Sequence, residues 1–189
     1  MILEKIETHV KQTCEREDNL LSNHFYHEHL EVVSEYAEKI CTQLSGDQEV
    51  VQIASYLHDI SAILDFKTLA THHQDSADIA EKLLRENGYN SAKIVQVKQC
   101  ILNHTTPISI TDASSIEEVC LSNADAIAQI IRPTYWLYFA YNILSLDYPK
   151  AKVWYINKIN NNWDALIEPA KTLIEEKYTA IKKAFDDSF

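Results

Sequence analysis

The scarcity of glycine constrains this sequence more than any other feature. The chain has only 2 glycines and 4 prolines, and the tight turns that join β-strands depend on these residue types. Apolar residues instead recur at spacings of three and four, which is the period of an amphipathic helix. The sequence therefore predicts an all-α fold.

Length and apolar content bound the domain organisation. The chain has 189 residues, of which 46% are hydrophobic, and this is enough for one domain with a sizeable core but short for two. No linker, repeat or low-complexity tract interrupts it. We predict a single domain over residues 1–189.

Charge excludes several classes of partner. The formal net charge is −11 and the lysines are scattered, so the protein should repel nucleic-acid polymers and anionic membranes. No stretch approaches the roughly 20 apolar residues of a membrane span, and the N-terminus has no apolar signal core. We expect a cytoplasmic protein in which an anionic substrate would need cations within the site itself.

The helix pattern has identifiable starts and stops. Asp47 can cap a helix, Gly88 can end one, and Ser114 with Glu117 forms a capping-box pattern. We expect helices over residues 2–14, 23–44, 48–58, 75–87 and 91–103, a sixth that begins at Ser114, and two or three more beyond Pro133. The aromatic residues of the C-terminal part are interpreted as core and wall, the alternative being a dedicated ligand site.

The cysteines are widely spaced and lie within helical patterns. No C-x-x-C pair occurs among them, so buried core thiols are favoured over disulfides or thiolate metal ligands. They are Cys14, Cys41, Cys100 and Cys120.

Three of the 8 histidines fall on apolar helical faces. His29 precedes Val33 by one turn, His58 follows Ala54 by one turn, and His104 continues the inner face of its helix. Taken singly, each is better interpreted as a hydrogen-bonded core histidine than as a metal ligand. Their common inward orientation is what distinguishes them.

Two aspartates accompany these histidines. Asp59 follows His58 directly, and Asp125 lies in the apolar stretch CLSNADAIAQI, where an isolated carboxylate would be costly to bury. Asp125 alone could cap a helix or pair with a lysine. Inward histidines and aspartates on different helices together indicate a divalent transition metal, because imidazole and carboxylate suit Mn, Fe, Co, Ni or Zn better than Mg.

The order of these residues resembles the HD-domain superfamily of metal-dependent phosphohydrolases. The segments that carry the resemblance are FYHEHLEVVSEYA, ASYLHDI, THHQDSADIAEKLL, CILNHTT and SNADAIAQI. They cover a core of about residues 23–132 and leave a C-terminal helical extension of about 133–189. The resemblance implies an HD-type helical bundle with additional C-terminal helices.

The resemblance also implies a ligand set. A first metal would be held by His29, His58, Asp59 and Asp125, and a second by His73 and His104, with Asp59 as a bridge. His73 is preferred to His72 because it stands three residues before Ser76. In the alternative, His73 and His104 contact substrate phosphate beside a single metal, and in either role they count with Asp59 as catalytic. The surface histidines are expected to be His9, His24, His27 and His72.

The sequence departs from the family after the His-Asp pair. Many members have glycine and often lysine there, whereas this chain has HDISAILDF, with Ser61 and Ala62. Lys67 is either a replacement for that positive side chain or a solvated loop lysine.

The implied activity is metal-dependent hydrolysis of a phosphoester or phosphoanhydride. One or two metal ions would activate water, and the substrate would be a small phosphorylated molecule such as a nucleotide. Two alternatives stay open: a metal-binding sensor or interaction module with little turnover, and a di-iron oxygenase-type enzyme.

Overall fold

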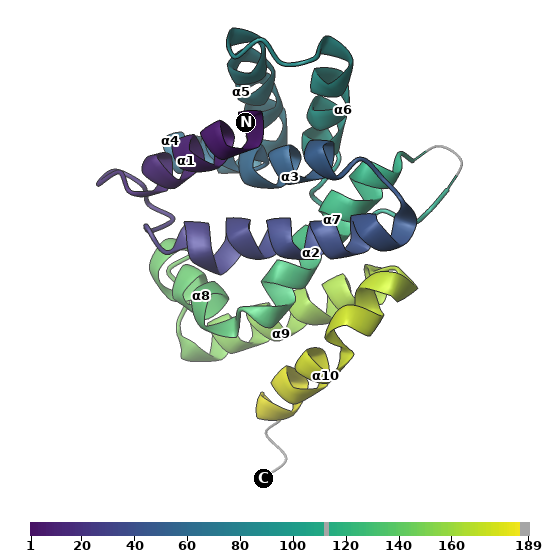
Figure 1. Ribbon diagram of the computed structural model, residues 1–189. Coiled ribbons are helices and arrows are strands. Elements are labelled where there is room, and N and C mark those ends of the chain that lie inside the picture. The colour runs from purple at the N-terminus through teal and green to yellow at the C-terminus, as the bar shows by residue number, and fades with distance from the viewer. Residues whose placement is uncertain (112–113, 186–189) are drawn as a thin grey trace.

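The computed structural model describes residues 1–111 and 114–185, and its regular structure is helical. No β-strand occurs within those two ranges, so the prediction of an all-α fold is confirmed. The elements shown in Figure 1 are α1 (Ile2–Cys14), η1 (Tyr26–Leu30), α2 (Glu31–Leu44), α3 (Gln48–Leu57), α4 (Ile60–Leu64), η2 (Phe66–Ala70), α5 (His72–Glu86), α6 (Ser91–Leu102), α7 (Ile116–Ile131), α8 (Pro133–Tyr138), η3 (Phe139–Ile143), α9 (Tyr148–Ala165) and α10 (Glu168–Ala184).

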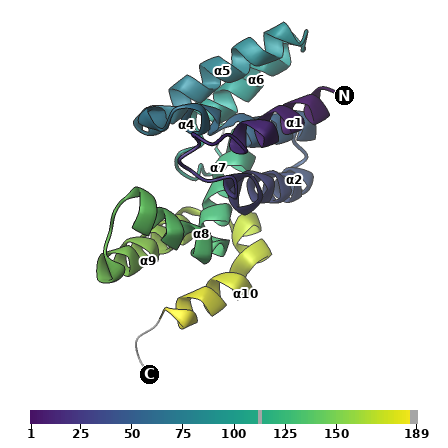
Figure 2. The same ribbon diagram turned by 90° about the vertical axis from the view of Figure 1, so that its left-hand side faces the viewer.

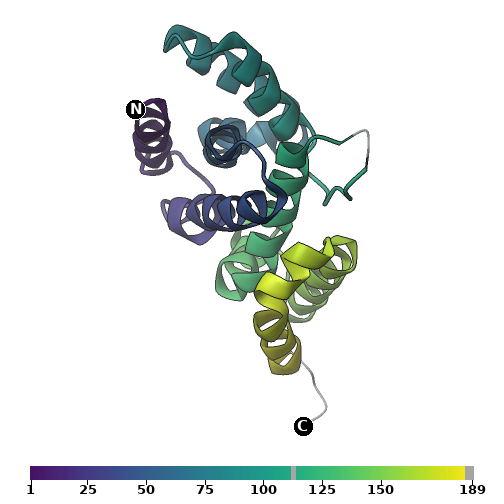
Figure 3. The ribbon, with the colours of Figure 1, turned by 45° about the vertical axis from the view of Figure 1, so that its right-hand side comes forward.

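Helix α7 connects two groups of helices. It packs on α2, α3 and α6 of the motif-bearing part and also on α9 and α10 of the C-terminal part. Figures 1 and 2 show α5 and α6 side by side at one end of the molecule and α8–α10 gathered at the other. In Figure 3, α7 runs between these groups. Asp125, the expected metal ligand on α7, is therefore carried by a helix that contacts both groups.

Side-chain caps determine where several helices begin. Asp47 accepts hydrogen bonds from the backbone N–H groups of Glu49 and Val50 and caps α3 as predicted. The capping box of α7 is formed by Ser115 and Glu118, so the prediction of Ser114 with Glu117 was wrong by one residue. Glu117 instead accepts a hydrogen bond from the backbone N–H of Asp47.

Two helix starts differ from the expectation. The helix expected over 23–44 consists of the π-helix η1 followed without a break by α2. Helix α5 begins at His72 rather than near Asp75, and the short elements α4 and η2, which were not expected, lead into it. The earlier start brings His72 into a regular helical turn, which matters for the site.

The C-terminal helices are anchored by buried contacts. Tyr155 on α9 is buried, and its hydroxyl donates a 2.7 Å hydrogen bond to the carbonyl oxygen of Ile130 on α7. Ile159 and Ile174 extend the same apolar interface. The four cysteines are buried and free, as predicted. Across the described helices, none combines the length and hydropathy that a membrane span requires.

We expect Tyr155→Phe to lower the free energy of unfolding by about 1 kcal/mol or somewhat more, because it leaves a buried carbonyl group without a donor. Urea denaturation of the two proteins measures this difference. Tyr148→Phe is the matched control, since Tyr148 is 68% exposed and its substitution should change stability little. Equal stability of the wild type and Tyr155→Phe would contradict the anchoring role.

Candidate metal centre

A π-helical turn positions the first histidine. The backbone N–H of Glu31 donates to the carbonyl oxygen of Tyr26, five residues earlier. Such π-helical turns are rare in proteins, and many of those that occur lie at functional sites. Within this turn His29 is 1% exposed, whereas His27 is exposed and pairs with Glu31. The two histidines of this turn therefore face opposite environments, as expected for helical residues two positions apart.

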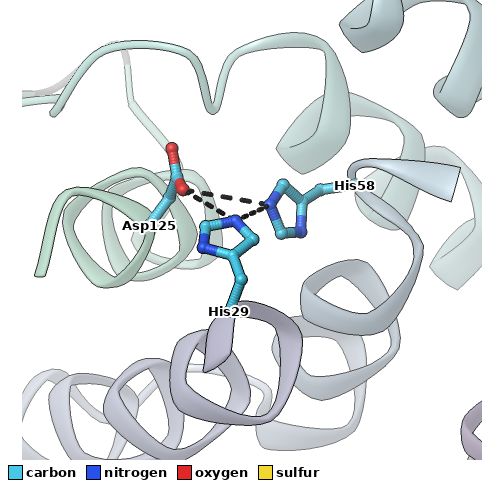
Figure 4. Close-up of side chains that lie close together, drawn as sticks. All are labelled: His29, His58 and Asp125. Atoms are coloured by element: carbon cyan, nitrogen blue, oxygen red, sulfur yellow. Dashed lines mark hydrogen bonds and ion pairs between the residues drawn. The ribbon is translucent and has the colours of Figure 1, made fainter. Parts of the chain in front are cut away.

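Two histidines and two aspartates from η1, α7 and the end of α3 form what we call the deep cluster. Nε2 of His29 lies 3.2 Å from Nε2 of His58, 3.3 Å from Oδ1 of Asp125 and 3.4 Å from Oδ2 of Asp59. Nε2 of His58 lies 3.2 Å from Oδ2 of Asp59. Figure 4 shows His29, His58 and Asp125 converging, and their ligand atoms lie within 4.8 Å of one another.

Two further histidines, which we call the outer pair, face the other oxygen of Asp59. Nε2 of His72 lies 3.3 Å from Oδ1 of Asp59 and 3.1 Å from Nε2 of His104. Nε2 of His104 lies 3.8 Å from the same oxygen. Asp59 thus belongs to the deep cluster through Oδ2, which faces His29 and His58, and directs Oδ1 to the outer pair.

Backbone carbonyl groups orient three of these imidazoles. Nδ1 of His58, His72 and His104 each approaches the carbonyl oxygen of the residue three positions earlier, at 2.8, 2.7 and 2.7 Å respectively. A carbonyl only accepts, so Nδ1 carries the proton, and the lone pair of a neutral ring is on Nε2. This is the hydrogen bond by which proteins prepare histidine as a metal ligand.

The donor set fits a divalent metal. In the outer pair, neutral imidazoles of His72 and His104 would direct lone pairs at each other across 3.1 Å. The two carboxylates of Asp59 and Asp125 add negative charge in a buried region. Such an arrangement requires positive charge, which either a proton or a metal ion can provide. Unlike the other three histidines, His29 has no carbonyl group to orient its ring, because its Nδ1 is buried with no partner among the described residues.

Without a metal, the proton is expected on His58. Burial acts to lower the pKa of His58, but the charges of Asp59 and Asp125 outweigh it and raise the pKa to about 9. The same ion pairs overcome the opposing effect of burial on the aspartates, so the pKa of Asp125 falls to about 2 and that of Asp59 falls well below its usual value. Burial and the His58 charge lower the pKa of His104 to about 4, which keeps it neutral at pH 7.

An amide holds the carboxylate of Asp125 in place. Nε2 of Gln129 donates to both oxygens of Asp125, at 3.0 and 2.9 Å. Oε1 of Gln129 in turn accepts a 2.8 Å hydrogen bond from Asn162 on α9. Gln129 was not predicted as part of the site, although its spacing of four from Asp125 places both residues on one helical face.

Two buried serines hold the backbone at His72 of the outer pair. The backbone N–H of Ser61 donates to Oγ of Ser76 at 3.1 Å, and Oγ of Ser61 donates to the carbonyl oxygen of His72 at 3.3 Å. The segment after the His-Asp pair, where the sequence departs from the family, therefore ties α4 to the start of α5. Lys67 is exposed there, so it brings no charge into the cluster.

The expected and observed histidines differ at one position. The structure brings His29, His58, Asp59, Asp125 and His104 together, as the expected ligand set has them. His72, expected on the surface, joins them with a side chain that is only 20% exposed. No hydrogen bond or ion pair within the described chain joins His73 to Asp59 or His104. The ring centroid of His73 lies 5.8 Å from that of His72.

Helix geometry explains this correction. Residues three and four apart both share a helical face, so spacing from Ser76 allows either His72 or His73. Because α5 begins at His72, the backbone of that residue already follows the helix and its ring turns toward Asp59. The other histidines expected on the surface, His9, His24 and His27, are exposed.

The clusters open into a pocket of about 210 Å³. Asp59, His72, His104 and Asp125 line it on one side. The remaining lining residues are mostly apolar and aromatic and include Leu21, Phe25, Leu69, Trp136, Phe139 and Trp154. The C-terminal aromatics thus act as core and wall, as interpreted from the sequence.

We expect metal binding at pH 7 to release about one proton, because His58 with a pKa of about 9 must become neutral to act as a ligand. Raising the pH toward 9 should therefore strengthen apparent Mn²⁺ affinity and reduce proton release. Calorimetry in buffers of different ionisation enthalpy measures the protons. His27→Gln is the control and should release as many protons as the wild type. A binding heat independent of the buffer would contradict this assignment.

Several solved structures share the fold. The Bacillus subtilis protein YpgQ superposes with a TM-score of 0.72 at 19% identity, over 97% of this chain and 91% of that chain. Its complex with ADP gives a TM-score of 0.71 at 20% identity, over 96% and 93%. A predicted HD superfamily hydrolase from an uncultured Thermotogales bacterium gives 0.66 at 20% identity, over 96% and 87%. No curated protein sequence matches the chain.

A protein-family model covers the part of the chain that carries the site. The model described as HD domain matches residues 26–130, more than half of the 189 residues. The match spans the segments from η1 to α7 that supply the deep cluster and the outer pair. The chain belongs to the HD-domain family.

Proposed function

We propose that this protein is a metal-dependent phosphohydrolase that acts on a small phosphorylated molecule, such as a nucleotide. The observation that carries the proposal is the position of Asp59. Its Oδ2 faces the deep cluster and its Oδ1 faces the outer pair, so one carboxylate can serve two neighbouring groups of ligands. HD-family membership supports hydrolysis as the reaction class.

The donor types favour a transition metal. Imidazole and carboxylate ligands suit manganese, iron, cobalt, nickel or zinc. The deep cluster supplies His29, His58, Asp59 and Asp125 for a first ion, and the outer pair supplies His72 and His104 for a second. A divalent metal in such a site contributes a water molecule of lowered pKa and positive charge near phosphoryl oxygens.

The surrounding residues hold these ligands in a fixed state. His104 stays neutral at pH 7 because its pKa is about 4, so it can offer its Nε2 lone pair without first losing a proton. Gln129 keeps both oxygens of Asp125 oriented. Pre-set ligands of this kind reduce the reorganisation needed when the substrate binds.

The pocket supports a small anionic substrate. Its volume of about 210 Å³ admits a phosphoryl group with part of a small molecule. A protein with a net charge of −11 repels anions in general, so positive charge at the clusters would be the local attraction for phosphate. YpgQ, which shares this fold, has been crystallised in complex with ADP, and this supports a phosphorylated ligand for the present protein.

We expect Asp59→Ala to abolish both stoichiometric metal binding and phosphate release, because it removes ligand oxygens facing both clusters. Elemental analysis and a phosphate-release screen of nucleotides and sugar phosphates with manganese, nickel or cobalt measure the two effects. Asp78→Ala is the matched control, since its side chain is 76% exposed and pairs with Lys98 on the surface. Wild-type protein that binds metal but releases no phosphate from any substrate would favour a sensor or an oxygenase-type enzyme.

The adjacent residues His72 and His73 provide a test of how many metal ions bind. We expect His72→Ala to lower manganese stoichiometry from two ions toward one, because it removes an imidazole beside Asp59 and His104. His73→Ala should leave the stoichiometry unchanged. If His72 instead contacts substrate phosphate, the His72→Ala protein should keep its metal while the Michaelis constant rises. Wild-type protein that never exceeds one ion at saturating manganese would remove the two-metal version of the proposal.

A further inference from the structure

Lys158 on α9 brings a positive charge to the wall of the metal pocket, within the C-terminal part that the HD model does not match. Its Nζ lies 5.2 Å from the ring centroid of Trp136 and 5.8 Å from that of Trp154. No carboxylate of the described chain forms an ion pair with it. Lys93 and Lys98, by contrast, each pair with two carboxylates, so Lys158 differs from lysines that are used to join helices.

A second donor without an acceptor lies on the same wall. Trp136 is 8% exposed and lines the pocket, and its Nε1–H is buried with no hydrogen-bond partner in the described part of the chain. A buried N–H group without an acceptor costs free energy. Nζ of Lys158 lies over the ring of Trp136, so the two donors are neighbours. Two neighbouring side chains thus each carry a donor without an acceptor, and a bound anion would supply one.

The electrostatics of Lys158 also depend on the clusters. Burial lowers its pKa, whereas the charges of Asp125 and Asp59 act in the opposite direction. A divalent metal would take up the negative charge of these two aspartates and leave Lys158 without that support. An anion placed between the metal centre and Lys158 would restore the balance of charge.

We propose that Nζ of Lys158 and Nε1 of Trp136 form an anion subsite, which binds a phosphoryl oxygen of the substrate beside the metal centre. The identity of the anion as a phosphate rests on the proposed function. The short segment after the His-Asp pair, α4, contains no basic residue, so α9 supplies this charge to the pocket. Charge-assisted N–H···O⁻ contacts are the strong type of hydrogen bond.

The subsite has a structural alternative with different consequences. Lys158 could serve only to pack its cation against Trp136 and Trp154, since such cation–π contacts are themselves stabilising. In that case its substitution would change stability but not phosphate affinity. Binding of inorganic phosphate and pyrophosphate to the manganese-loaded full-length chain distinguishes these roles without any need for turnover.

We expect Lys158→Gln to weaken phosphate binding about tenfold, the effect of losing one charged hydrogen bond, with manganese stoichiometry unchanged. Lys158→Arg should retain most of the affinity. Trp136→Phe, which keeps an aromatic ring and removes the N–H, should weaken it about threefold or more. Calorimetry measures affinity, and elemental analysis measures the metal content of each variant.

Lys150→Gln is the matched control. It removes one lysine charge from the same helix, at an exposed position paired with Asp147, and should bind phosphate like the wild type. Circular dichroism checks the folding of each variant, and Trp136→Phe and Lys158→Arg keep the proposal testable if Lys158→Gln does not fold. Unchanged phosphate affinity in correctly folded Lys158→Gln and Trp136→Phe would overturn the subsite, as would manganese-loaded wild type that binds neither phosphate nor pyrophosphate.

The same variants separate this proposal from the proposed function. If the substitutions weaken phosphate binding while the wild type hydrolyses no phosphorylated substrate, the anion subsite stands and the hydrolase does not. If the wild type hydrolyses a substrate and Lys158→Gln keeps the same affinity for phosphate and the same Michaelis constant, the hydrolase stands and the subsite does not.

Discussion

Two carboxylates withdrawn from solvent, on Asp59 and Asp125, determine the rest of this structure. An ionised carboxylate in a protein interior is costly unless it meets a cation and hydrogen bonds. The imidazoles of His29 and His58 lie close enough to share a positive charge with both. In the absence of metal, protonated His58, whose pKa is raised to about 9, provides this positive charge. A divalent ion would provide more charge at the same place.

Two features of the backbone near the site differ from the regular helices expected there. The π-helical turn that ends at Leu30 stands where a regular helix was expected, and it carries the buried His29. Ser61 and Ser76 hold the start of α5 against α4, so that Nε2 of His72 lies beside the carboxylate of Asp59. Both features bring a candidate ligand to Asp59.

Much of the site follows from local patterns. The inward faces of His29, His58 and His104 could be predicted because neighbouring apolar residues mark the buried side of each helix. The ambiguous positions are those where two adjacent residues satisfy the same rule. Ser114 and Ser115 each have a glutamate three residues later, and only the start of the helix distinguishes them.

Other features had no local signature. A π-helix is defined by backbone hydrogen bonds that no residue type announces. Trp136 and Lys158 reach the pocket through packing between segments far apart in the chain, and helical periodicity carries no information on which distant element a face will meet. The resemblance to HD domains ends before these residues, so it could not supply them.

The hydrogen-bonded line from Asn162 through Gln129 to Asp125 links α9 to a candidate metal ligand. Free-energy coupling between two sites is reciprocal. If the docked α9 favours the metal-binding orientation of Asp125, then an ion bound there must favour the docked α9 to the same extent. Metal occupancy at Asp125 and the docking of α9 on α7 are then two coupled equilibria, so a rise in metal concentration would also hold the C-terminal helices in place.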